Sequence, residues 1–192
     1  MKLSTINEGI INEGGLSRVL SHVENNYFTV LTAFRGDYTL KQNRQRNADL
    51  EREFRAIGAG GIKLIGHWQE VPDGEWFGRN LSEINPELLT DTIEESYLVP
   101  MPKGMNNKDF LNWTVQTINK FNQDAAVFGT PGEIFLVDKA GDLISIGKGV
   151  KVDTIAQAYS TIKGKNFIFE GTMGPSSNAH RLLLQKRGIG WV

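Results

Sequence analysis

The segment 27–34 constrains the fold most, because both of its alternating sets of side chains can be buried. One set is Phe28, Val30, Thr32 and Phe34, and the other is Thr29, Leu31 and Ala33. A strand with one face in water alternates between apolar and polar residues, whereas a strand with two apolar faces is covered on both sides. We therefore expect a central strand here, which ends at Arg35.

The other expected elements follow from the spacing of apolar residues and from turn residues. Helices are expected at 40–57, 108–122 and 153–162, and a first helix begins at Leu16 and is broken at Asn25. Strands are expected at 62–69, 92–99, 125–128, 133–137, 142–146 and 166–170, with a long loop at 71–89. Helical crossovers and hairpins are mixed in this order. We therefore predict a single α/β (α+β mixed) domain at 16–192, with a mixed parallel/antiparallel sheet flanked by helices, preceded by a flexible N-terminal arm at 1–15.

Composition excludes several classes of protein. The chain has no cysteine, which rules out disulfides, thiolate metal sites and a cysteine nucleophile. Its three histidines show no metal-binding spacing, so we predict no metal site, although carboxylates could still hold magnesium, and no motif identifies a cofactor. A net charge of −1 gives no general attraction to nucleic acid. No apolar run reaches the roughly 18 residues that cross a bilayer, and the N-terminus lacks the apolar core of a signal peptide. We expect a cytoplasmic protein that contacts neither nucleic acid nor membrane.

Two asparagines interrupt the apolar stripe of the expected helix 40–57. The stripe runs through Leu50 and Phe54, and its extension toward the N-terminus reaches Asn47 and Asn43. Ligands of α/β sheets favour the crevice beyond the carboxyl ends of strands, beside helix N-termini, and Arg35 follows the central strand. Arg35, Asn43 and Asn47 therefore form the leading candidate for a ligand-binding cluster. The alternative is that both amides are solvated or serve as helix caps.

Four arginines lie elsewhere around the same helix: Arg44, Arg46, Arg52 and Arg55. Asp49, Glu51 and Glu53 are interspersed with them, which is typical of a salt-bridged surface. Phosphate or RNA binding is the other interpretation, but the helix lacks aromatic residues on which bases could stack. Arg46 lies between Asn43 and Asn47 in the sequence and is included among the candidate ligand-binding residues.

Two expected strands bring titratable residues toward this cluster. His67 and Glu70 lie at the end of strand 62–69, where a histidine near a carboxylate could act as an acid or a base. In strand 92–99 either Glu94 or Glu95 must point inward, whichever face is buried, and Arg35 is the natural cation for that carboxylate. His67 and Glu95 are the candidate catalytic residues, and Glu70 is a candidate ligand contact. A satisfied structural histidine and a structural ion pair are the competing interpretations.

Two polar turns complete the candidates. Gln123 and Asp124 lie between a helix and a strand, where they could contact a ligand or simply form the turn. Gly147, Lys148 and Gly149 precede the expected helix 153–162, the order that a phosphate loop requires, but the third glycine of such a loop is absent.

Several short motifs resemble those of one family. They are Thr32-Ala33-Phe34-Arg35, Asn43-Arg44-Gln45-Arg46-Asn47-Ala48-Asp49-Leu50, Gly66-His67-Trp68-Gln69-Glu70, Glu95-Ser96-Tyr97 and Asn122-Gln123-Asp124. Across 17–146 the chain resembles a group of small phage and bacterial proteins catalogued only as a domain of unknown function. The resemblance implies a phage or bacterial origin and a shared polar cluster, which adds Ser96 to the candidate ligand-binding residues, but it implies no reaction.

Two functions remain open. The first is a cleft at a sheet edge that binds a small anionic or nucleotide-like ligand. The second is a non-catalytic phage protein, either a virion component or an inhibitor of a host factor, that contacts a protein partner or its own copies. An acidic stretch at 70–95 and a basic stretch from Lys139 onward would then be contact surfaces.

Overall fold

The computed structural model describes residues 16–70, 90–152, 158–162 and 165–169. A helix at 16–25 comes first, and the later elements are β1 (Phe28–Leu31), α2 (Leu40–Ala56), β2 (Ile62–Glu70), β3 (Thr90–Pro100), α3 (Asn107–Lys120), β4 (Ala125–Thr130), β5 (Glu133–Asp138), β6 (Leu143–Gly147), β7 (Val150–Val152), β8 (Ala158–Ile162) and β9 (Lys165–Phe169). The expected arm 1–15, loop 71–89 and tail from Gly171 lie outside the described residues.

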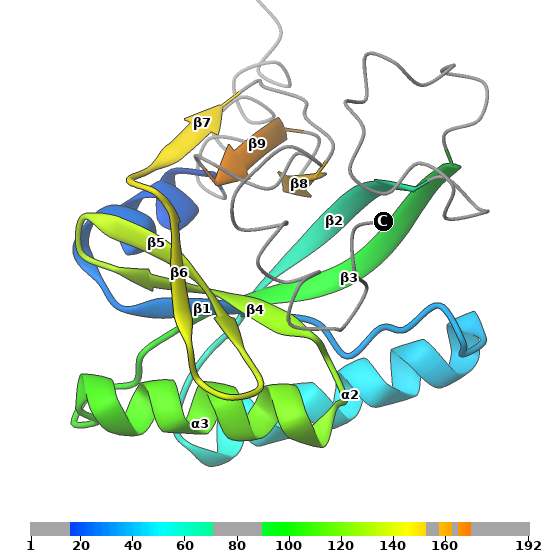
Figure 1. The fold of residues 1–192 in the computed structure, drawn as a ribbon, viewed down its shortest axis with the longest axis horizontal. Helices are drawn as coiled ribbons and strands as arrows, with labels where there is room; N and C mark the ends of the chain where they lie inside the picture. The colour runs from blue at the N-terminus through cyan, green and yellow to red at the C-terminus, as the bar shows by residue number, and fades with distance from the viewer. Residues whose placement is uncertain (1–15, 71–89, 153–157, 163–164, 170–192) are drawn as a thin grey trace, which may run out of the picture.

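The strands form one sheet of nine strands in the order β6-β5-β4-β1-β3-β2-β8-β9-β7 (Figure 1). All the strand pairs are antiparallel. The α+β class is therefore confirmed, but the expected mixed parallel/antiparallel sheet is wrong. Each helical crossover skips one strand: β3 lies between β1 and β2, which α2 connects, and β1 lies between β3 and β4, which α3 connects. The parallel strands that each crossover joins are thus never hydrogen-bonded to each other.

The central position of the first strand is confirmed. β1 pairs with β3 on one side and with β4 on the other, and Phe28, Thr29 and Leu31 on its two faces are buried. The strand is shorter than expected, because the chain leaves the sheet after Leu31. A larger error concerns 153–162, for which we expected a helix. Residues 158–162 form β8 instead, which pairs with β2 and β9, and its Tyr159, Thr161 and Ile162 are residues that favour strands.

Apolar residues form one cluster on each face of the sheet. α2 and α3 cover one face, where Phe54 of α2 packs against Tyr97 of β3 with ring centroids 5.3 Å apart. The helix at 16–25 covers the other face through Val19 and Val23, which pack with Phe28. Two covered faces are what the sequence of 27–34 predicts. None of the described helices is long and apolar enough to cross a membrane.

The sheet curls strongly, as its connectivity requires. β6 and β7 are its two edges, yet only Lys148 and Gly149 connect them. Gly147 and Val150 are therefore at most about 11 Å apart. Side chains from both edge strands, Ile146 and Val150, also pack with Val23 of the first helix. The helix at 16–25 thus lies on the concave side, near the seam where the two edges approach.

Candidate functional site

The N-terminus of α2 places the two asparagines against the sheet. Thr39 is the N-cap: its side-chain oxygen accepts a hydrogen bond from the N–H of Gln42 at 3.3 Å, and the Gln42 side chain accepts one from the N–H of Thr39 at 2.9 Å. This capping box satisfies N–H groups that the first turn leaves without partners. The helix begins at Leu40, so Asn43 and Asn47 lie one turn apart on its buried face.

Both asparagine side chains hold the main chain where it leaves the sheet. Asn47 accepts a hydrogen bond from the N–H of Ala33 at 2.8 Å and donates one to the carbonyl of Glu95 at 2.7 Å. Asn43 accepts from the N–H of Arg35 and donates to the carbonyl of the same residue, both at 2.9 Å. Asn43 is 7 % exposed and Asn47 2 % exposed. The two amides therefore replace the strand partner that the chain loses after β1.

Arg46 and Gln123 hold the remaining carbonyls of the same segment. The Arg46 Nε donates to the carbonyl of Ala33 at 2.8 Å, and the Gln123 side chain donates to the carbonyl of Phe34 at 3.0 Å. With the Thr32 hydroxyl, which accepts from the N–H of Phe34 at 3.1 Å, every main-chain N–H and C=O of residues 33–35 has a partner. Buried main-chain N–H and C=O groups need hydrogen-bond partners, because an unpaired buried polar group destabilises the fold.

Two arginines also bind the C-terminus of α3. Asn122 adopts a left-handed conformation with φ of 52°, and the N–H of Gln123 bonds to the carbonyl of Ile118 at 2.9 Å, the pattern of a Schellman cap. Arg46 and Arg35 donate to the carbonyls that follow, those of Phe121 and Asn122, at 2.5 Å each. Cations are favoured at this end of a helix. The candidate residues thus bind α2, the 32–35 segment and α3 to one another.

Glu95 has different partners from the expected one. Its carboxylate lies 2.8 Å from Lys63 Nζ and 4.0 Å from Arg44 Nε. Arg35, which we expected to pair with the inward glutamate of this strand, is 3.0 Å from Asp37 instead. An Arg35–Glu95 ion pair, one of the two that the sequence allows, is therefore not formed. The Arg35 side chain reaches the C-terminus of α3, whereas the Glu95 carboxylate contacts Lys63 of β2, and β2 and β1 lie on opposite sides of β3.

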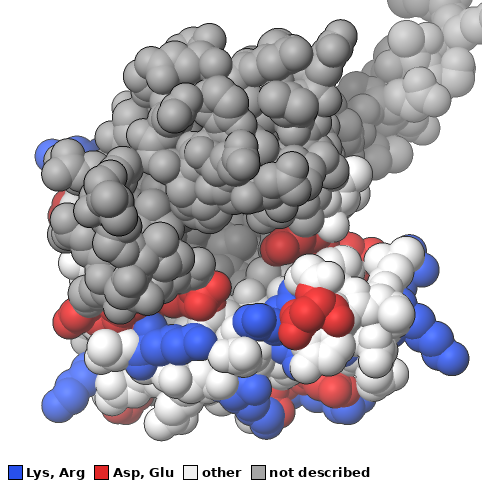
Figure 2. Space-filling view, turned by 45° about the vertical axis from the view of Figure 1, so that its right-hand side comes forward, with Lys and Arg blue, Asp and Glu red and all other residues white. Residues whose placement is uncertain are grey.

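The other arginines of α2 form the expected salt-bridged surface. Arg52 pairs with Asp49 and Arg55 with Glu51. Figure 2 shows lysines and arginines interspersed with acidic residues over the described part of this face. Arg46 is the exception, because its guanidinium lies over the ring of Tyr38, 4.7 Å from the centroid.

Three further candidates are placed less completely. His67 lies opposite Ile93 in β3 and Tyr159 in β8, and Glu70 lies opposite Thr90. The side chains of His67 and Glu70 lie outside the described part of the structure, so catalysis by His67 and ligand binding by Glu70 stay predictions. Catalysis by Glu95 also stays a prediction, since the Glu95 carboxylate is held by Lys63. Asp124 is exposed, with its carboxylate 4.0 Å from Lys139 Nζ.

Ser96 and Tyr97 are buried in β3. Ser96 lies on the face opposite Glu95, near the backbone of Gly66. Burial raises the pKa of the Tyr97 hydroxyl, and the nearby Glu51 carboxylate raises it further. Tyr97 therefore stays neutral at physiological pH and offers no anion to a ligand.

Among the described residues, no three His, Cys, Asp or Glu side chains cluster in a way that could hold a metal ion. The connection through Lys148 joins two strands. The strand-to-helix order of a phosphate loop, which we considered for Gly147–Gly149, is therefore not what the described residues form there.

Sequence reasoning missed one surface. Leu40, Ile65 and Ile93 are exposed large apolar side chains, and Ile65 lies opposite Glu95, which pairs with Lys63. A signal was present in the sequence. Lys63, Ile65, His67 and Gln69 form one face of the expected strand, and Ile65 is the apolar residue on this otherwise polar face.

No protein-family model matches the chain, and no curated protein matches it. The resemblance to phage and bacterial proteins therefore stays a prediction.

Proposed function

We propose that this chain is a non-catalytic binding protein that recognises another protein through one surface beside the N-terminus of α2. The observation that carries the proposal is the exposure of Leu40, Ile65 and Ile93, which are 57 %, 42 % and 58 % exposed. Large aliphatic side chains that are exposed together and rimmed by polar groups are typical of interaction sites. We call these three residues, together with Lys63, Glu95 and Arg44, the aliphatic surface.

Strand register and helix spacing place the residues of the aliphatic surface near one another. Ile65 lies directly opposite Glu95, and Ile93 is two residues before Glu95, so all three share one face of the sheet. Leu40 precedes Arg44 by one helical turn, and the Arg44 Nε is 4.0 Å from the Glu95 carboxylate. Two neighbouring strands and one helix therefore contribute to a single surface.

The charges of the aliphatic surface favour an acidic partner. The Lys63 side chain is 54 % exposed and that of Arg44 63 %, against 25 % for the single carboxylate of Glu95. The excess of exposed positive charge complements carboxylates at the rim of a partner's apolar patch. We infer a protein partner that presents aliphatic or aromatic side chains flanked by aspartates or glutamates.

The polar cluster of Asn43 and Asn47 supports this proposal over a ligand cleft. The amides of both residues bind main-chain groups of the 33–35 segment and of β3. A ligand would have to displace hydrogen bonds that the fold itself needs, and leaving a buried group unpaired costs about 1–3 kcal/mol.

The test compares three forms of the immobilised protein in extracts of the cells that make it. These are the wild type, the double variant Ile65→Glu/Ile93→Glu and the control Leu143→Glu. Both variants replace exposed side chains only, so all three forms should unfold at similar temperatures. Leu143 is an exposed leucine of β6. The proposal predicts a captured protein that is retained by the control, lost with the double variant and released by salt. Equal capture by all three forms, or capture by none, contradicts it.

A second function, binding of a small anion, rests on one observation. Arg35 donates to the Asn122 carbonyl at 2.5 Å, and Lys139 donates to the Asn122 side chain at 2.7 Å, so two partly exposed cations meet at one residue. An anion could bridge them, in competition with Asp37 and Asp124. Pyrophosphate or AMP should then raise the melting temperature of the wild type and of a Lys108→Gln control, but not of Arg35→Gln/Lys139→Gln. Equal shifts in all three forms would exclude this site.

A further inference from the structure

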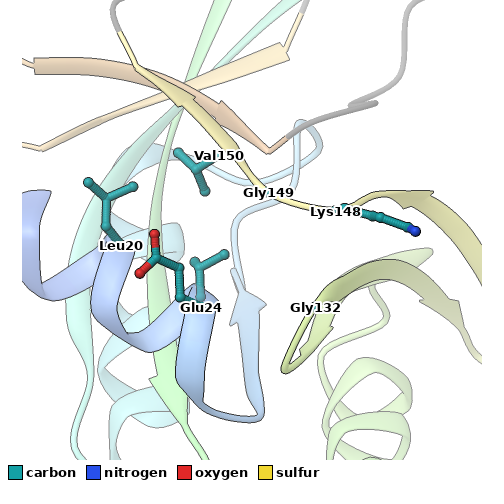
Figure 3. Close-up of a pocket in the computed structure, with 7 residues that line it drawn as sticks. Leu20, Glu24, Gly132, Lys148, Gly149 and Val150 are labelled. Atoms are coloured by element: carbon teal, nitrogen blue, oxygen red, sulfur yellow. The ribbon is translucent and has the colours of Figure 1, made fainter.

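A small cavity lies at the seam where the two edges of the sheet approach each other. Its volume is about 270 Å³, just below the range of roughly 300–1,000 Å³ that is usual for ligand sites. The helix at 16–25 forms one wall, the turn between β4 and β5 a second, and the connection from β6 to β7 a third (Figure 3). Three elements that are distant in sequence thus enclose one space, at the mouth of a curled sheet where ligand sites recur.

The walls are mainly apolar side chains and bare backbone. Leu20 and Val23 from the helix and Val150 from β7 supply the apolar part. Gly132 and Gly149 supply backbone without side chains. Gly132 has a φ of +97°, which other residues rarely adopt, so this wall is kept free of a side chain by the geometry of the turn.

One acidic and one basic residue line the cavity, Glu24 and Lys148, and their side chains point in different directions. The Glu24 carboxylate extends toward Leu20 and Val150, whereas the Lys148 side chain extends away from the cavity (Figure 3). Glu24 also lies in the last turn of the helix at 16–25, where the helix dipole adds partial negative charge. Both effects favour a cation inside the cavity and disfavour an anion.

We propose that this seam cavity binds a small ligand in which an apolar body carries an ammonium group. The ammonium pairs with the Glu24 carboxylate, and the apolar body packs on Leu20, Val23 and Val150. Because the ligand touches both the first helix and the connection between the two sheet edges, binding holds the seam closed. This site lies on the opposite face of the sheet from α2, so it is independent of the aliphatic surface.

The test uses hexylammonium as the probe, with hexanoate and ammonium chloride as matched controls. Binding is followed by the amide resonances of the full chain in ¹H–¹⁵N spectra. The proposal predicts that hexylammonium gives saturable shifts at the amides of Leu20, Glu24, Gly132 and Gly149, and that hexanoate and ammonium give none there.

Two variants complete the test. Glu24→Gln should weaken hexylammonium binding about tenfold, the loss expected for a charged hydrogen bond, whereas Glu53→Gln, on α2 at the other side of the sheet, should leave it unchanged. The spectra of both variants report directly whether each is folded. Equal binding of hexanoate, equal affinity in Glu24→Gln, or shifts that avoid the cavity amides would overturn the proposal.

Discussion

Phe28 of β1 and Gly129 of β4 lie directly opposite each other, and the phenyl ring covers the glycine. A Cβ atom on Gly129 would lie 1.9 Å from Cε1 of Phe28. Phe28 is fully buried in the cluster beneath the helix at 16–25, so its ring has no room to move aside. The absence of a side chain at Gly129 is therefore a condition for packing the concave side of the sheet.

Gly129→Ala should destabilise the protein by about 1–3 kcal/mol or more, because overpacking a buried ring forces the strands apart. Gly66→Ala on β2 is the matched control: there a Cβ would be 3.6 Å from the nearest atom, the carbonyl oxygen of Glu94. This variant should unfold at the wild-type temperature or slightly above it. Chemical denaturation measures both free energies of unfolding, and similar values for the two variants would contradict the assigned register.

The sequence predicts most elements because their apolar spacing is regular. The stripe of Leu50 and Phe54 defines α2, and the two buriable faces of 27–34 identify the central strand. The direction of strand pairing could not be predicted, because it depends on which strand lies between the two that a helix connects. The order of the strands in the sheet is also needed to decide which cation Glu95 contacts.

The polar cluster was located from the sequence, but its partners were not. Asn43 and Asn47 stand out because amides on a buried helix face need partners. Their partners are main-chain groups of residues 33–35 and of Glu95, and no sequence pattern indicates that β1 ends at Leu31. Local propensity favours a longer strand, and the side chains of α2 override it.

Asn47→Ala should destabilise the protein by about 2–4 kcal/mol. The substitution leaves the buried N–H of Ala33 without an acceptor and removes one hydrogen bond to the Glu95 carbonyl. Asn47→Asp keeps the acceptor for Ala33 but sets a carboxylate oxygen against that carbonyl, so we expect it to destabilise as well. The control is Asn25→Ala, since Asn25 is exposed and donates a hydrogen bond to Ser21 of its own helix. Thermal unfolding should separate Asn47→Ala from this control, and equal melting temperatures would show that the buried amide is dispensable.

The ion pair of Lys63 and Glu95 should couple weakly. The two groups are 2.8 Å apart, but the Lys63 side chain is 54 % exposed, so solvent screens their attraction and a double-mutant cycle should give about 0.5 kcal/mol. The cycle uses Lys63→Ala and Glu95→Gln, alone and combined. A parallel cycle with Arg35→Gln and Glu95→Gln should give no coupling, because Arg35 pairs with Asp37. Coupling in the second cycle and none in the first would show that Glu95 pairs with Arg35 and not with Lys63.

Acid should destabilise the first helix through His22. Burial lowers the pKa of His22 below its ordinary value, and the positive charge of Arg18 lowers it further. The folded protein thus favours neutral His22. Its contribution to stability is complete above the pKa of the unfolded chain, about 6.5, and is lost as the pH falls through the lower pKa of the folded state. His22→Gln cannot become charged, so its melting temperature should fall less than that of the wild type between about pH 8 and pH 5. Arg18→Ala should reduce the fall in part, since it removes the smaller cause only. Parallel pH profiles for the wild type and His22→Gln would show that His22 titrates equally in the folded and unfolded states.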